Sequence, residues 1–175
     1  NEGGDYDQYA GYTYTSQFNG GSAKVRGLEL AYQQQFTFLP GFLQAFGAYA
    51  NYSRNETEGN YGGATTTKRV AGFIPETANL GLSYLRSPWN IRLQYNYAGR
   101  RLSSVSASQA RLSYFKARGI YDLKTVFTIS RNVSLYFDVW NIFDEQEYAQ
   151  EWEGGRVGRN FRTGRQLIGG INWKL

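Results

Sequence analysis

The 175-residue sequence contains no cysteine and no histidine. Without cysteine, the chain cannot form disulfide bonds or thiolate metal sites. Without histidine, it cannot form imidazole-ligated metal sites or a histidine-based catalytic triad. We therefore expect neither a metal nor a cofactor in this chain.

Few of the remaining residues are suited to catalysis. A serine nucleophile would need lysine as its base, and no Ser-x-x-Lys element lies on a suitable helix. Paired carboxylates can serve glycoside hydrolysis or bind Ca²⁺, but carboxylates crowded in a polar loop are usually solvated charges. We interpret Glu145, Glu147, Glu151 and Glu153 in this second way and predict that the chain is not an enzyme.

Long hydrophobic runs are also missing. Hydrophobic residues make up 41% of the sequence, mean hydropathy is -0.55, and no run approaches the roughly 18 apolar residues of a membrane helix. A helical membrane protein is excluded. Proline is scarce, with 3 residues, whereas the sequence has 21 glycines, 15 tyrosines, 11 phenylalanines and 4 tryptophans. This mixture favours strands, tight turns and rings at an interface.

The net charge of +5 is compatible with binding to nucleic acid, to an anionic membrane surface or to an acidic ligand. The arginines are spread along the chain and do not cluster on one helix or ribbon. We therefore expect no nucleic acid partner.

Alternation with a period of two is the dominant pattern. In the last segment Leu167, Gly169, Ile171, Trp173 and Leu175 share one face, and mainly polar or small residues share the other. The same alternation recurs along nearly the whole chain. It predicts about eight antiparallel strands, near residues 6–18, 23–38, 42–55, 76–86, 91–100, 115–130, 133–143 and 164–175.

The connections between these strands alternate in length. Short turns are expected near residues 39–41, 87–90 and 131–132, and long polar loops near 56–67, 103–113 and 144–160; the connection at 19–22 departs from this by being short. Alternating short turns and long loops are typical of an outer-membrane β-barrel. The predicted fold class is thus an all-β, antiparallel transmembrane β-barrel.

Three elements resemble a known family. Val139-Trp140-Asn141-Ile142-Phe143-Asp144, followed by Tyr148, is similar to an element in the penultimate strand of TonB-dependent outer-membrane receptors. The segment 164–175 looks like the strand that closes their barrels, with Leu175 where phenylalanine is usual. The stretch 23–30, with Leu39-Pro40-Gly41 behind it, resembles one of their hairpins.

The resemblance implies that residues 1–175 are the C-terminal segment of a 22-stranded receptor barrel in the bacterial outer membrane, with the plug domain outside this chain. Such receptors import a scarce ligand, for example siderophore-iron, cobalamin or carbohydrate, with energy supplied by TonB. The implied partners are outer-membrane lipid, the plug, TonB, the barrel-assembly machinery and a small-molecule ligand. Gly170 and Trp173, with Leu175 at the end, correspond to the C-terminal signal that the assembly machinery reads.

The predicted inward face of the strands and the predicted external loops supply candidate ligand-binding residues. Arg92 and Arg100, with Lys124 and Arg162, would form a positive lumen wall that attracts an anionic ligand or pairs with carboxylates of a plug. In the external loops, Tyr61, Tyr148 and Trp152 are candidates for stacking on a ligand. The residues do not identify that ligand.

Two other interpretations remain open from the sequence. One is a self-contained eight-stranded outer-membrane barrel with a structural or adhesion role, and the other is a soluble ligand-binding barrel. Small inward residues such as Gly11, Gly27, Gly81 and Gly170 favour a wider lumen than an eight-stranded barrel has. Pairing of the first strand with the last would indicate the small closed barrel.

Overall fold

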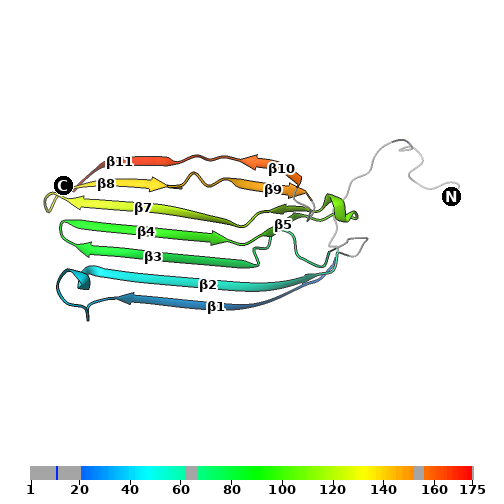
Figure 1. The fold of residues 1–175 in the computed structure, drawn as a ribbon, viewed down its shortest axis with the longest axis horizontal. Helices are drawn as coiled ribbons and strands as arrows, with labels where there is room; N and C mark the ends of the chain where they lie inside the picture. The colour runs from blue at the N-terminus through cyan, green and yellow to red at the C-terminus, as the bar shows by residue number, and fades with distance from the viewer. Residues whose placement is uncertain (1–10, 12–20, 62–66, 152–155, 175) are drawn as a thin grey trace.

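The computed structural model describes residues 11, 21–61, 67–151 and 156–174, and in this part the chain is built almost entirely of antiparallel strands. Seven strands form one sheet in the order β1-β2-β3-β4-β7-β8-β11 (Figure 1). Their bounds are β1 Ala23–Gln35, β2 Phe46–Gly59, β3 Glu76–Arg86, β4 Trp89–Ala98, β7 Arg118–Thr128, β8 Val133–Trp140 and β11 Gln166–Trp173. No helix in the described ranges has the length and apolarity to cross a membrane.

Four shorter strands form a second sheet, in the order β10-β9-β6-β5. They are β5 Arg101–Ser104, β6 Ser113–Phe115, β9 Glu147–Glu151 and β10 Arg156–Phe161. This sheet prolongs the first one, because Ala98 pairs with Arg118 and, three residues on, Arg101 pairs with Phe115 in the same register. The prediction of loops at 103–113 and 144–160 is therefore wrong in part, since each segment contains strand residues.

The two ends of the main sheet differ, as the sequence predicts. Short turns join β1 to β2, through the 3-10 helix Gly41–Ala45, and also β3 to β4 and β7 to β8; all lie at the end that we call the short-turn end. Longer connections lie at the opposite, long-connection end (Figure 1). The predicted strand at 6–18 falls, apart from Gly11, outside the described residues.

One face of the main sheet is apolar across all seven strands. Register places Leu30 beside Tyr52, then Ala78 and Tyr97, and the same face continues through Leu123 to β11. Its side chains are uncovered: Leu30 is 58% exposed. For the described strands, the facing predicted from the sequence is confirmed. In β2, where alternation alone is ambiguous, pairing puts Phe46, Ala48, Ala50 and Tyr52 on this apolar face.

Aromatic rings border the apolar face at both ends. At the short-turn end Trp89 packs on Phe127 with ring centroids 4.7 Å apart. At the long-connection end Tyr95 and Tyr121 lie 4.6 Å apart. Trp89 and Tyr97 are eight residues apart on β4, about 26 Å at 3.3 Å per residue. Two aromatic girdles around a band of that size are typical of transmembrane barrels.

Tyrosine rings cover glycines on the opposite, polar face. Tyr49 pairs with Gly81, and Tyr136 pairs with Gly170. A Cβ atom at either glycine would collide with the ring of its partner. Two of the small inward residues predicted from the sequence, Gly81 and Gly170, are thus covered by cross-strand tyrosines, an arrangement that fixes the register of neighbouring strands, whereas Gly27 faces the Asn55 side chain.

The buried core is small and lies beyond the main sheet. Leu102, Leu112 and Tyr114 are 2–3% exposed and pack with Ala71 and Val105. The long-connection end is therefore held by its own hydrophobic cluster, whereas the main sheet has side chains exposed on both faces.

Candidate functional site

The polar face of the main sheet is cross-linked by side-chain hydrogen bonds. Gln94 Nε2 donates to the Tyr49 hydroxyl at 2.7 Å, a bond that spans β3. Asn96 Nδ2 donates to Asp122 Oδ2 at 3.2 Å, and Asp122 Oδ1 accepts from the backbone N–H of Asn141 at 2.9 Å. Polar side chains bonded in this way suit a surface that meets water or another polar surface.

Three charged residues form a row across this face. Arg92 on β4 pairs in register with Lys124 on β7, which pairs with Asp138 on β8. Two cations side by side, with one carboxylate beyond, leave a positive local potential. Arg92 and Lys124, two members of the predicted positive wall, are thus neighbours near the short-turn end.

The other two predicted cations lie elsewhere. Arg100 follows β4, with its guanidinium carbon 4.1 Å from the centre of the Tyr114 ring. Its Nε is buried and has no partner among the described residues. Arg162 is bound to Asp144 in the connections beyond β8 and β10. The four cations therefore do not form one continuous wall.

The segment after β8 is held by a buried asparagine. Asn141, 7% exposed, has a φ of 53°. Its Oδ1 accepts from the Glu145 backbone N–H at 2.8 Å, and its Nδ2 donates to the Glu145 carbonyl at 3.0 Å and to the Gly164 carbonyl at 3.3 Å. Asparagine tolerates the left-handed backbone conformation better than most residues do. The Asn-Ile-Phe-Asp element is therefore a structural clasp between adjacent strands.

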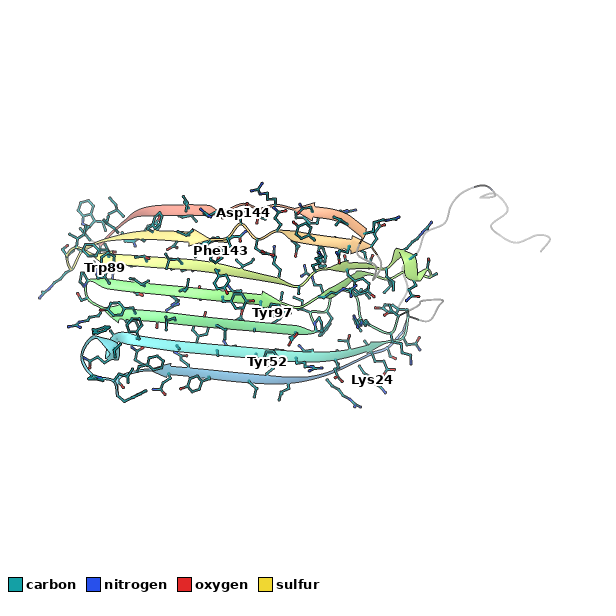
Figure 2. The ribbon with its side chains drawn as sticks, in the orientation of Figure 1. Lys24, Tyr52, Trp89, Tyr97, Phe143 and Asp144 are labelled. Atoms are coloured by element: carbon teal, nitrogen blue, oxygen red, sulfur yellow. The ribbon has the colours of Figure 1, made fainter. Side chains whose placement is uncertain are left out.

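Asp144 extends the clasp to the next strand. Its Oδ2 accepts from Arg162 Nε at 2.9 Å and also from Nη2. Asp144 lies in the connection after β8, beside Phe143 in Figure 2, and Arg162 follows β10. Hydrogen bonds from Arg162 lower the pKa of Asp144, and the same contact raises the pKa of Arg162. Asp144 and Arg162 thus join the ends of two neighbouring strands.

The loop aromatics make contacts within the chain. The Tyr61 hydroxyl donates to the Arg69 carbonyl at 2.8 Å and accepts from the Ala71 N–H at 2.9 Å. The Tyr148 hydroxyl donates to Gln146 Oε1 at 3.0 Å, and Lys116 Nζ lies 5.4 Å from the centre of its ring. Trp152 lies outside the described residues. The structure does not bring Tyr61, Tyr148 and Arg92 into one site.

An ion-pair cluster lies where the small sheet meets β7 of the main sheet, and the sequence did not predict it. Arg101 Nη2 lies 2.8 Å from Glu147 Oε1, and Arg118 Nη2 lies 3.8 Å from the same atom. The guanidinium carbon of Arg101 also lies 4.2 Å from the centre of the Phe115 ring. No local signal marks this cluster, because Glu147 follows Arg101 by 46 positions.

The C-terminal strand places its predicted signal residues on different faces. Gly170 lies under the Tyr136 ring on the polar face. Trp173 ends β11 on the apolar face and is 74% exposed. Leu175 lies outside the described residues.

No metal centre is formed by the described ranges, in which no three Asp or Glu side chains gather closely enough to hold an ion. Of the predicted acidic cluster, Glu147 is used in ion pairs on the small sheet and Glu151 lies 3.1 Å from Arg156. Glu153 is outside the described part of the chain.

Comparison with known proteins identifies a family. A search of curated proteins gave no match, and a search of solved structures gave none either. The family model described as "TonB dependent receptor-like, beta-barrel" matches residues 2–142, which is most of the chain. This match agrees with the antiparallel strands, the two-faced sheet and the paired aromatic girdles. The chain therefore belongs to the TonB-dependent receptors, β-barrel proteins of the bacterial outer membrane that act in transport and not in catalysis.

Proposed function

We propose that this chain is the C-terminal wall of an import receptor, whose larger barrel surrounds a plug domain and takes up a scarce ligand with energy supplied by TonB. The observation that carries the proposal is the main sheet itself: seven long strands, apolar on one face and polar on the other. The apolar face, with its girdles, meets outer-membrane lipid. The polar face turns toward a hydrated lumen and the plug.

The free edges of the sheet support a larger barrel. Within the described residues, β1 has no neighbour beyond β2, and β11 has none beyond β8. The two edge strands lie on opposite sides of the sheet, with the other five between them (Figure 1). An eight-stranded closed barrel would place β1 and β11 only two strand spacings apart, about 10 Å. Backbone groups left unpaired in lipid are costly, so we propose that strands outside the described residues cover both edges.

In this proposal Arg92 and Lys124 contact either the ligand or the plug domain. Their positive potential suits carboxylates of a plug or an anionic ligand such as a ferric siderophore. Cobalamin and carbohydrates, the other ligand classes imported by such receptors, would depend on the lumen's hydrogen-bonding side chains. Arg100, Tyr61, Tyr148 and Trp152 also remain candidates for ligand contact.

The last strand is proposed to carry the signal for barrel assembly. Gly170, Trp173 and Leu175 are among the last six residues of the sequence. The exposed ring of Trp173 lies on the face that we propose meets lipid. A Trp173→Ser variant is expected to assemble less efficiently in the outer membrane. Asn172→Ser, on the polar face of the same strand, is the matched control.

Uptake by the full-length receptor tests the import function. Cells carrying the intact gene are supplied with radiolabelled ferric siderophores, cobalamin and oligosaccharides, with and without functional TonB. TonB-dependent accumulation of one probe is the expected result. Equal accumulation without TonB, or none of any probe, would argue against an energy-coupled importer.

Cysteine cross-linking tests the architecture, because residues 1–175 contain no cysteine that would compete with the introduced pair. Cysteines placed at Tyr12 and Ile171 would form a disulfide in a closed eight-stranded barrel, where the first predicted strand meets the last. In the larger barrel they stay apart. Efficient cross-linking in the assembled protein would therefore favour the small structural barrel over the receptor.

A further inference from the structure

The wall of the main sheet contains a hollow of about 560 Å³ at the long-connection end. It arises because β3 begins only at Glu76, paired with Arg54, whereas β2 continues to Gly59. The chain before β3 crosses this gap. Asn55 N–H donates to the Pro75 carbonyl at 2.7 Å, and Gly72 N–H donates to the Leu102 carbonyl at 2.8 Å. The hollow is thus framed by β2, β5 and the segment between Lys68 and Pro75.

Three arginines from three separate segments line this hollow: Arg54 on β2, Arg69 before β3, and Arg100 between β4 and β5. None of them has an ion-pair partner in the part of the chain that the structure describes. Arg101, next in the chain to Arg100, is by contrast paired with Glu147. Two carboxylates, Glu56 and Glu76, line the same hollow, so its three guanidiniums leave it with one net positive charge.

Arg100 is the lining arginine whose orientation is fixed by a packing contact. Stacking on the Tyr114 ring, which is 3% exposed, holds its guanidinium in place. Its Nε is buried and lacks an acceptor among the described residues. A donor without accessible surface cannot itself reach a bound molecule, so a ligand would contact this guanidinium through its terminal nitrogens. A guanidinium held in one orientation is suited to an oxyanion.

The number and placement of the arginines favour phosphate over carboxylate. A planar carboxylate is satisfied by one guanidinium in a two-point contact. A tetrahedral phosphate has oxygens in several directions and can be approached from the three segments at once. In this arrangement the three guanidiniums would carry the binding of the phosphate.

The remaining lining suits a sugar. Glu56 and Glu76 supply carboxylate oxygens that accept hydrogen bonds from hydroxyls, and Glu76 Oε1 is already ordered by the Tyr52 hydroxyl at 2.6 Å. Tyr97 and Phe73 supply aromatic rings that can pack on the apolar side of a sugar ring. The volume of the hollow lies within the range of small-molecule sites, about 300–1,000 Å³.

We propose that this hollow binds a phosphorylated sugar, with the phosphate between Arg54, Arg69 and Arg100 and the sugar hydroxyls on Glu56 and Glu76. The site lies at the aromatic girdle, since Tyr97 belongs to both, and Figure 2 shows Tyr52 and Tyr97 at a similar level of the sheet. That level is where lipid headgroups meet a transmembrane barrel. The sugar phosphate therefore comes either from a glycolipid headgroup or from solution. This binding is separate from import and does not require it.

Calorimetric titration of the full-length receptor in detergent, in phosphate-free buffer, tests the site. The probes are glucose 6-phosphate, a phosphorylated glucosamine glycolipid in mixed micelles, and glucose as the unphosphorylated control. Arg100→Gln is expected to weaken binding of the phosphorylated probe about 10- to 100-fold, the loss of a charge-assisted hydrogen bond. Arg86→Gln, an exposed arginine at the short-turn end, is the matched control and should leave affinity unchanged.

Replacing Arg100 removes its contact with the Tyr114 ring and could disturb folding. Two further variants, Arg54→Gln and Arg69→Gln, test the site without that effect, because both side chains are exposed. Binding of the glycolipid alone assigns the headgroup as the source, and binding of glucose 6-phosphate assigns a soluble sugar. The proposal is overturned if neither phosphorylated probe binds, if glucose binds equally well, or if the variants in the hollow all behave like Arg86→Gln.

Discussion

Asn141 and Glu145 are joined by two hydrogen bonds that run in opposite directions between one side chain and one backbone. Asn141 Oδ1 accepts from the Glu145 N–H at 2.8 Å, and Asn141 Nδ2 donates to the Glu145 carbonyl at 3.0 Å. The chain thereby closes a compact turn between β8 and β9 without a glycine. The family-like element at 139–144 is thus explained by architecture, since its asparagine orders the backbone and its aspartate ties the neighbouring strand.

Replacing Asn141 by alanine is expected to lower the free energy of unfolding by about 2 kcal/mol, because partly buried backbone groups of Glu145 lose their partners. Asn141→Asp should be milder, since it keeps one acceptor and tolerates the positive φ. Urea unfolding of the receptor in detergent gives the measurement. Asn51→Ala, an exposed asparagine on the polar face, is the control. Equal stability of Asn141→Ala and the control would show that the Asn141 side chain does not stabilise the turn between β8 and β9.

The Asp144–Arg162 pair predicts a pH dependence with a defined sign. Arg162 lowers the pKa of Asp144 below its ordinary value of 3.8. A carboxyl with a depressed folded-state pKa stabilises fully above the unfolded value and loses this contribution as pH falls through the folded one. Unfolding midpoints of the wild type should therefore fall more steeply below about pH 4 than those of Asp144→Asn. Arg162→Gln should flatten the profile in the same way, and a profile unchanged by either substitution would contradict the pairing.

The faces of most strands could be predicted from the sequence, because pairing preserves alternation. Leu93 and Arg92 lie on the faces that period two assigns to them, and register carries those faces across the sheet. In β2 the small residues Gly47 and Ala48 give no contrast. Only pairing of Ala48 with Leu82 decides the facing. In β2 the facing is therefore determined by pairing with β3 and not by the local sequence pattern.

The small sheet and the hollow could not be predicted, because their parts are distant in the chain. Tyr114 pairs with Leu102 on one side and Gln150 on the other, so a polar segment becomes a strand only between these partners. Arg54, Arg69 and Arg100 meet because β3 starts late relative to β2. A single sequence carries no signal for that offset.

Gly81→Ala is expected to destabilise the receptor by about 1–3 kcal/mol, because the new methyl group displaces the Tyr49 ring. Adding Tyr49→Ala should recover part of the loss, since the collision is gone; a double-mutant cycle measures this coupling. Gly169→Ala is the matched control, as its Cβ would meet neighbours at 3.5 Å or more. Strict additivity of the Gly81 and Tyr49 substitutions would mean that the ring does not depend on the glycine.

Arginine substitutions at two consecutive positions of β4 separate the two faces of the sheet. Leu93 lies between the girdles on the apolar face, and Gln94 lies on the polar face. Leu93→Arg should cost about 2–4 kcal/mol, the cost of a cation facing the middle of a bilayer. Gln94→Arg should cost far less, losing chiefly the hydrogen bond to Tyr49. Refolding yield and urea unfolding in lipid vesicles give both values. Should the Gln94 variant prove the more damaging, the polar face and not the apolar one would be in contact with lipid, and the orientation proposed for the whole sheet would be reversed.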